Sequence, residues 1–266
     1  MGMAGRAACS TGGNMGAVAR TPLQGEGTQE QAWLHCDWLW QQPTTSATAL
    51  CSGHDRMVVV APHPDDEILG CGGLLHHAVG QGIDVSVVAV TDGEACYPGE
   101  PWWTPERLRS ARRAELAAAL GELGIPVGSI FHLGIADGAV SAHEQGLEGW
   151  LQQYLQPRDL VLAPWRFDGH PDHEAAGRAA CRAARAVGCH RLEYPAWGWH
   201  WLDPACAHMA WEVPKLVDIS AVASAKRNAI AHFRTQTGDV VGLNSPPVLP
   251  AHVLARFFRN YEVFLA

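Results

Sequence analysis

The sequence predicts a Rossmann-like α/β fold, a three-layer sandwich in which helices cover both faces of a mostly parallel central sheet. Two observations support this prediction. From residue 56 onward, short apolar segments alternate with longer segments of helical period, which is the pattern of successive βαβ units. The short segments are apolar at almost every position, as expected for strands with both faces buried. With 266 residues, 47% of them hydrophobic, the chain is long enough for one large domain of this class.

The first part of the predicted sheet contains two strands and two helices. RMVVVA (56–61) and DVSVVAVT (84–91) are apolar runs of strand length. A helix at 67–82 connects them and ends at a pair of glycines. A second helix follows at 106–124, where leucines recur at helical spacing.

The alternation continues to the end of the chain. Further strands are predicted at 129–134, 159–164, 190–195 and near 215–219. Further helices are predicted at 147–155, 173–188, 221–234 and 250–259. The Trp-rich segment 196–214 fits neither period, so we expect a surface excursion or lid there.

We expect a single folded domain preceded by a tail. Residues 1–31 are rich in Gly, Ala, Ser and Thr, and are predicted to be flexible. Residues 32–266 would form the domain, with its core at about 56–260.

Composition excludes several classes of partner and location. A net charge of −8 without a basic stripe argues against a nucleic-acid partner. No apolar run is long enough for a membrane span, and none in the first 31 residues suits a signal-peptide core. The eight cysteines form no C-x-x-C pair, so we expect reduced thiols in the cytoplasm. The sequence leaves open whether the chain forms a homo-oligomer.

Ligand-type side chains follow three of the predicted strands. The three clusters are HPDDE (63–67), TDGE (91–94) and WRFDGHPDH (165–173). Because the carboxyl ends of parallel strands meet at one edge of a sheet, we expect these clusters to surround one crevice.

The first and third clusters share an H-P-D spacing that suits a catalytic metal site. A turn imposed by Pro64 would bring His63 and Asp66 together on one ion, and His173 would supply a third ligand from across the crevice. Two imidazoles and one carboxylate, with a position left for water, are typical of catalytic zinc. Fe(II) suits the same ligands.

Three neighbouring side chains are candidates for catalysis. Asp65 would lie beside the metal-bound water and take its proton, because zinc lowers the pKa of that water to about 7. His170, as a protonated imidazole, would stabilise an oxyanion or donate to the leaving group. Asp172 would orient His170 by hydrogen bonding.

A purely structural interpretation competes with the metal site. In a single H-P-D-D cluster, Asp65 or Asp66 could instead accept hydrogen bonds from helix N–H groups, and Glu67 is expected to be structural in either case. Two such clusters at strand ends favour the metal. The glycines of GCGG (70–73) lack the G-x-G-x-x-G spacing, so no dinucleotide cofactor is expected.

Several polar residues are candidates for contacts with a substrate. Arg112 falls on the apolar stripe of its predicted helix, so it either pairs with Glu115 or reaches into the crevice to hold a substrate hydroxyl or phosphate. Asp137 and Glu94 follow predicted strand ends, where they could bind sugar hydroxyls or simply form turns.

At these residues the sequence resembles the PIG-L/LmbE-like zinc deacetylases. PHPDDEILGCGG (62–73) resembles the first signature of the family and GHPDH (169–173) the second. The other family motifs occur in the usual order, namely TDGE, the R-x-x-E of Arg112 to Glu115, LGI, and DG at 137–138. The resemblance covers roughly residues 56–260.

The resemblance implies an LmbE-like fold, the zinc ligands and base named above, and substrate contacts at Arg112 and Asp137. The chain departs from some members at Asp168, where they carry a Tyr that assists the tetrahedral intermediate, and we treat Asp168 as a candidate substrate contact. The predicted activity is zinc-dependent removal of an N-acyl, mainly acetyl, group from an amino sugar or a glycosylated metabolite.

Two other functions stay open at this point. One is a non-hydrolytic sugar- or nucleotide-binding Rossmann-like protein with a structural metal. The other is a hydrolase of a different amide or ester in secondary metabolism.

Overall fold

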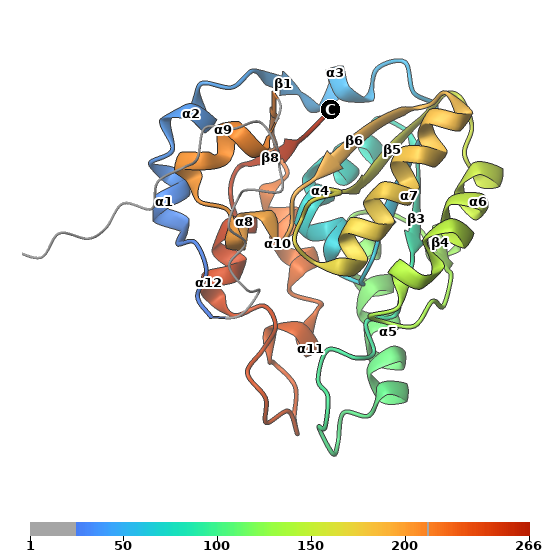
Figure 1. Ribbon diagram of the computed structural model, residues 1–266, viewed down its shortest axis with the longest axis vertical. Helices are drawn as coiled ribbons and strands as arrows, with labels where there is room; N and C mark the ends of the chain where they lie inside the picture. The colour runs from blue at the N-terminus through green and yellow to red at the C-terminus, as the bar shows by residue number, and fades with distance from the viewer. Residues whose placement is uncertain (1–24, 212) are drawn as a thin grey trace, which may run out of the picture.

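The computed structural model describes residues 25–211 and 213–266. At its centre lies a five-stranded parallel sheet with the order β4-β3-β2-β5-β6 (Figure 1). Its strands are β2 (Arg56–Ala61), β3 (Asp84–Ala89), β4 (Ile130–His132), β5 (Asp159–Pro164) and β6 (His190–Tyr194). The predicted α/β fold is confirmed, and these strands occupy the expected segments.

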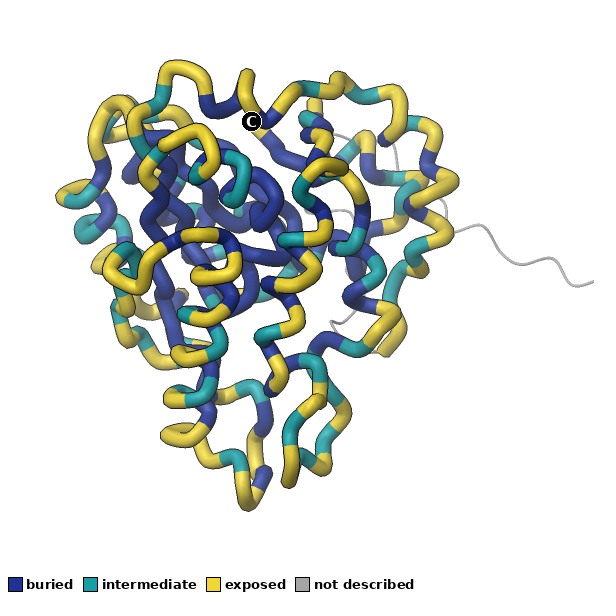
Figure 2. The backbone as a smooth tube through the Cα atoms, turned by 180° about the vertical axis from the view of Figure 1, so that it is seen from behind, coloured by how far each residue is buried: buried dark blue, intermediate teal, exposed yellow. Residues whose placement is uncertain are grey.

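Helices bury both faces of this sheet, as the apolar strands predicted. Met57 and Val59 of β2 join one hydrophobic core, while Val58 and Val60 join another on the opposite face. The first core is covered by α4 (Asp66–Gly80) and α5 (Pro105–Glu122), and the second by α6 (Glu144–Tyr154) and α7 (Pro171–Val187). Viewed from behind, the buried backbone is concentrated in this centre (Figure 2).

A second, three-stranded sheet lies beside β6. It consists of β1 (Thr44–Ser46), β7 (Lys215–Asp218) and β8 (Tyr261–Phe264), with β7 between the other two. Reciprocal backbone hydrogen bonds of 2.8 Å between Glu193 and Leu265 join it to the edge of the main sheet. The sequence predicted only β7, because β1 consists of three polar residues and β8 is only four residues long.

The remaining helices are short. They are α1 (Glu30–Leu34), α2 (Asp37–Trp40), α3 (Ala47–Cys51), α8 (Gly198–Trp201), α9 (Ala207–Ala210), α10 (Ala223–Ile230), α11 (Arg234–Thr237) and α12 (Ala251–Leu254). Single 3-10 turns occur at Val127–Ser129, Val140–His143, Pro204–Cys206 and Ala255–Phe257. None of the helices in the described ranges is both long and apolar enough to cross a membrane.

Two expectations about domain organisation are corrected. Residues 25–31 of the predicted tail belong to the fold, since α1 begins at Glu30 and Arg259 donates to its carboxylate; residues 1–24 lie outside the described residues. The segment 196–214 is not a surface excursion over its described part, because Trp199, Trp201 and Trp211 are buried in the core.

The cysteines also differ from expectation. Six of them, at positions 36, 51, 71, 96, 181 and 189, are free thiols. Cys206 is disulfide-bonded, so the expectation that all the thiols are reduced is wrong.

The strand order places the metal-type motifs at the topological switch point of the sheet. The chain runs outward from β2 through β3 to β4, and then returns to β5 on the other side of β2. The loops after β2 and β5 therefore diverge around a crevice at their carboxyl ends, which is where ligands bind in such sheets.

Candidate active site

Three ligand-type side chains meet at this crevice. His63 follows β2, Asp66 begins α4, and His173 lies in the first turn of α7. Asp66 Oδ2 lies 3.1 Å from His173 Nε2 and 3.4 Å from His63 Nδ1, and these two ring nitrogens are 3.3 Å apart. Neighbouring ligand atoms around tetrahedral zinc, with bonds of about 2.0–2.1 Å, are about 3.3 Å apart. The spacing and chemistry of the three atoms therefore fit one divalent ion.

Both imidazoles are oriented by carboxylates on their far sides. His63 Nε2 lies 3.1 Å from Asp137 Oδ1, and His173 Nδ1 lies 2.9 Å from Asp168 Oδ2. A ring nitrogen that donates to a carboxylate carries the proton, so the lone pair of each ring lies on the nitrogen facing Asp66. This is the tautomer that a metal ligand requires.

The surroundings of the cluster favour positive charge. Burial alone would lower the pKa of His173, but Asp66 and Asp168 outweigh it and raise that pKa to about 9. Burial likewise opposes protonation of His63, yet the aspartates around it raise its pKa well above the usual value. An excess of buried carboxylates stabilises positive charge, and a bound metal ion would supply that charge.

Asp65 is held beside the cluster by a buried arginine. Arg112 Nη2 donates to Pro64 O at 2.7 Å and lies 3.2 Å from Asp65 Oδ2, while Nη1 donates to Gly93 O at 2.9 Å. Asp65 has a φ of 135°, a strained value for a residue with a side chain. Burial raises the pKa of Asp65 to about 7, although Arg112 opposes the rise. A carboxyl group that titrates near neutrality suits a general base.

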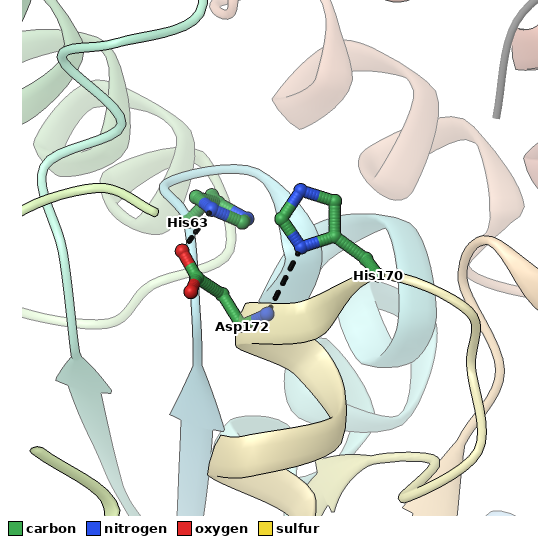
Figure 3. A group of neighbouring side chains, drawn as sticks. All are labelled: His63, His170 and Asp172. Carbon is green, nitrogen blue, oxygen red and sulfur yellow. Dashed lines mark hydrogen bonds and ion pairs between the residues drawn. The ribbon is translucent and has the colours of Figure 1, made fainter. Parts of the chain in front are cut away.

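His170 and Asp172 do not pair through their side chains as expected. The Asp172 carboxylate accepts hydrogen bonds from Gly138 N and Val140 N, at 2.7 and 3.2 Å, and its Oδ2 lies 3.5 Å from His63 Nε2. The backbone N–H of Asp172 donates to His170 Nδ1 at 3.2 Å (Figure 3). Asp172 thus fixes the loop after β4 against His63.

His170 is neutral in this environment, rather than protonated as the sequence led us to expect. Burial lowers its pKa to about 3, with further lowering by His173 and His63. Because Nδ1 accepts a hydrogen bond, the ring proton is on Nε2. His170 lines the cavity, so it can offer one N–H donor there.

A second group of ligand-type atoms also lies close together: His63, His170 and Asp172 (Figure 3). In that group the Nδ1 atom of His170 and both carboxylate oxygens of Asp172 already accept hydrogen bonds from backbone N–H groups. In the set of His63, Asp66 and His173, Asp66 Oδ2 also accepts a hydrogen bond from His63 N, but neither of the two facing ring nitrogens accepts one from the backbone, so this set fits an ion better.

The residues expected to touch a substrate divide into two pairs. Arg112 and Asp137 line the cavity, whereas Glu94 and Asp168 are buried off its wall. Asp168 is completely buried, and its oxygens accept hydrogen bonds of 2.7–3.0 Å from the backbone N–H groups of residues 196–198. Glu94 Oε1 accepts a hydrogen bond from Arg109 at 3.1 Å. Glu94 and Asp168 therefore hold protein groups rather than face the cavity.

Arg112 and Asp137 also make their polar contacts with protein groups. Asp137 Oδ2 accepts a hydrogen bond from Ala95 N at 2.9 Å, in addition to its contact with His63. Glu115, the alternative partner expected for Arg112, accepts hydrogen bonds from Thr235 instead. The sequence analysis did not predict that Asp137 and Asp168 orient the imidazoles of His63 and His173. The predicted metal site could have suggested these roles, because ligand imidazoles usually donate their second N–H to a nearby carboxylate.

The cluster opens into a cavity of about 370 Å³. His63, Asp65, Asp66 and His170 line one part of it, as the motifs predicted. Much of the remaining wall comes from the segments 196–200, 236 and 248–257, which carry no motif. A volume of this size suits a small molecule, since ligand pockets measure roughly 300–1,000 Å³.

Comparison with known proteins identifies relatives of this chain. Residues 58–184 match the family model PIG-L, described as GlcNAc-PI de-N-acetylase, and this range includes both H-P-D motifs. The chain is 28% identical over 220 residues to the Bacillus subtilis protein named "Probable N-acetyl-alpha-D-glucosaminyl L-malate deacetylase 2", covering 78% of this chain and 98% of that one. It is 28% identical over 239 residues to a Nocardioides 1D-myo-inositol 2-acetamido-2-deoxy-alpha-D-glucopyranoside deacetylase, covering 75% and 74% of the two chains.

Solved structures share the fold. The conserved protein TT1542 from Thermus thermophilus has a TM-score of 0.57 and 27% identity, covering 79% of this chain and 93% of that one. The N,N'-diacetylchitobiose deacetylase of Pyrococcus horikoshii has a TM-score of 0.55 and 22% identity, covering 78% and 79%. The matched domain at residues 58–184 and the relatives that align along most of their length support a relationship of this chain to the PIG-L/LmbE-like deacetylases.

Proposed function

We propose that this protein is a metal-dependent hydrolase that removes an N-acyl group, foremost an acetyl group, from an amino sugar or a sugar-bearing small molecule. The observation that carries the proposal is that Asp65 lines the same cavity as His63 and Asp66. The relatives named above, which are deacetylases of glucosaminyl compounds, support the choice of bond. The cytoplasmic location stays a prediction from the sequence, and the oligomeric state stays open.

Zinc is the proposed ion, held by His63, Asp66 and His173, and Fe(II) suits the same donors. When bound, such an ion lowers the pKa of a water molecule to near neutrality and polarises an acyl oxygen.

The side chains of this protein would handle the protons of the hydrolysis. Asp65 accepts a proton from the attacking water and returns it to the nitrogen as the amide bond breaks, so that amide and water give an amine and a carboxylic acid. His170 donates its Nε2–H to the acyl oxygen as negative charge develops there. Arg112 keeps Asp65 in place.

Amine release from a panel of N-acetylated amino sugars and their glycosides tests this proposal. The metal-loaded protein is expected to release amine, and a chelator is expected to stop it. Asp65→Asn should abolish turnover while the bound metal, measured by elemental analysis, stays unchanged. Asp84→Asn is the control, because Asp84 is exposed at the opposite end of the sheet. Normal turnover in Asp65→Asn would exclude Asp65 as the base.

The ligand set has its own test. His173→Ala should lose the metal, whereas His170→Ala should keep it and lose about 100-fold in kcat, the usual cost of removing one oxyanion donor. Loss of the metal in His170→Ala and its retention in His173→Ala would instead assign the ion to the group of His63, His170 and Asp172. If the metal maintained folding but no substrate in the panel released amine, the non-hydrolytic alternative would be favoured.

A further inference from the structure

One part of the cavity wall is formed by segments that contribute nothing to the metal cluster. Its apolar side chains are Leu69, Trp197, Val248, Leu249, Val253 and Phe257. A single cationic side chain, Arg256, lies among them on the wall. No hydrogen bond or ion pair joins Arg256 to His63, Asp66 or His173.

Arg256 is buried, with only 3% of its surface exposed. Its Nε donates to Thr28 O at 3.0 Å, its Nη2 to Glu26 O at 2.7 Å, and its Nη1 to His200 Nδ1 at 2.9 Å. These three partners are two carbonyl groups and a ring nitrogen, and none of them carries a negative charge. A guanidinium has five N–H donors, so two are left over for another ligand.

Glu30, a carboxylate whose charge acts on Arg256, does not pair with it. Glu30 pairs with Arg259, whose Nε lies 2.8 Å from Glu30 Oε1. Within residues 25–211 and 213–266, no carboxylate forms an ion pair with Arg256. Burial and the positive charge of Arg259 together lower the pKa of Arg256 to about 10, against a weaker opposing effect of Glu30. Glu30 is thus engaged by Arg259, and the positive charge of Arg256 lies at the cavity wall without an ion-pair partner among the described residues.

A buried charge without a partner is costly, and such groups are normally paired. We propose that Arg256 binds an anionic group, a carboxylate or a phosphate, on the portion of the substrate attached to the amino sugar. The apolar side chains around it would pack against the carbon skeleton that bears the anion. This inference rests on the proposed function, because it places the substrate in the same cavity.

The competing explanation is that Arg256 only fastens residues 26–28 to α8. The two roles differ in their consequences for the substrate. A fastening role predicts that losing Arg256 affects neutral and anionic substrates equally. An anion-binding role predicts a selective loss for the anionic substrates.

The test compares three N-acetylglucosaminides that differ in one substituent: the carboxymethyl glycoside, the 1-phosphate and the nearly isosteric neutral ethyl glycoside. For the wild-type protein, kcat/KM should be about 10- to 100-fold higher for at least one anionic compound than for the ethyl glycoside, the range expected for hydrogen bonds to a charged group. Preference between the carboxymethyl and phosphate compounds identifies which anion the site takes. Arg256→Met should remove the preference by raising KM for the anion, and Arg256→Lys should keep part of it.

Arg227→Gln is the matched control. Arg227 also donates to a backbone carbonyl, Phe258 O at 2.8 Å, but it is exposed and does not line the cavity. This variant should keep the wild-type preference. Equal losses on all three glycosides in Arg256→Met, or no preference in the wild-type protein, would overturn the inference.

Binding of the deacetylated glycosides, measured by calorimetry, separates this inference from the proposed activity. The carboxymethyl and phosphate derivatives of glucosamine should bind more tightly than the ethyl derivative in wild type and not in Arg256→Met. If that pattern holds while no glycoside releases amine, the anion site stands and the proposed deacetylase activity fails. If amine is released but the pattern is missing, the anion site is overturned.

Discussion

Asp168 Oδ2 lies 2.9 Å from Nδ1 of His173, and both side chains are completely buried. The same carboxylate accepts hydrogen bonds from the backbone N–H groups of residues 196–198. One side chain thus orients an imidazole of the metal-type cluster and anchors the segment that forms part of the cavity wall. The position of the cluster and the shape of the cavity are coupled through Asp168.

Replacing Asp168 by Asn should weaken metal binding selectively. An amide has one acceptor oxygen, so its NH2 group would face donors that the carboxylate now satisfies. We expect metal affinity to fall about 10- to 100-fold, the usual cost of losing such an outer partner, in competition titrations with a chelator. Asp159→Asn is the control, because Asp159 is also buried but binds Arg56 at the far end of β5. Equal metal affinity in the two variants would contradict the orienting role.

Replacing Arg112 by Lys should lower kcat more than it raises KM. Arg112 holds Asp65 and two backbone carbonyls with a planar fork, which a single ammonium group cannot reproduce. A displaced base costs up to about 100-fold in rate, so we expect kcat to fall about 10- to 100-fold with KM nearly unchanged. Arg113→Lys, on the exposed side of the same helix, should behave like wild type. A raised KM at normal kcat would instead identify Arg112 as a direct substrate contact.

The sequence predicted the central sheet and the metal-type cluster because both are recorded in local patterns. Strands such as β2 and β5 are apolar at nearly every position, and their burial on both faces is the physical cause of that pattern. The H-P-D motifs place His63 and His173 at two strand ends that the parallel topology brings together.

The rest depends on contacts between segments distant in sequence. The helix predicted at 221–234 divides into α10 and α11. Phe233 lies between the two helices, and its side chain is completely buried in the core. The helix predicted at 250–259 shortens to α12 and a 3-10 turn, which brings Arg256 to the cavity wall. The residues of this cavity wall follow no helix or strand periodicity in the sequence, because they have in common only the ligand that they would contact. The sequence therefore could not predict them.

Gly70 lies where α4 crosses a buried tyrosine, and alanine there should destabilise the fold. A Cβ atom at Gly70 would lie 2.3 Å from Cδ2 of Tyr194, whose hydroxyl donates to Val60 O at 2.9 Å. The ring cannot move without breaking that bond, so we expect the free energy of unfolding to fall by about 1–3 kcal/mol in urea denaturation. Gly80→Ala, near the end of the same helix with no atom within 4 Å of the new Cβ, should be neutral or slightly stabilising. Equal stability of the two variants would argue against this close packing.

Tyr97 connects two segments that lie around the cavity. Its hydroxyl donates to Thr235 O at 2.8 Å and accepts from Val248 N at 3.2 Å, and Val248 lines the cavity. Tyr97→Phe should therefore lower the free energy of unfolding by about 1–2 kcal/mol near neutral pH, because it leaves two polar groups without this partner.

The same hydroxyl makes this loss depend on pH. Burial raises the pKa of Tyr97 from 10 to about 12. Because the folded-state pKa lies above the unfolded value, the contribution of the protonated hydroxyl is complete below pH 10 and is lost as the pH rises towards 12. In urea denaturation, the stability gap between wild type and Tyr97→Phe should be constant from about pH 7 to 9 and smaller at about pH 11. A gap that stays the same or widens at the higher pH would show that the hydroxyl is not held protonated by the fold.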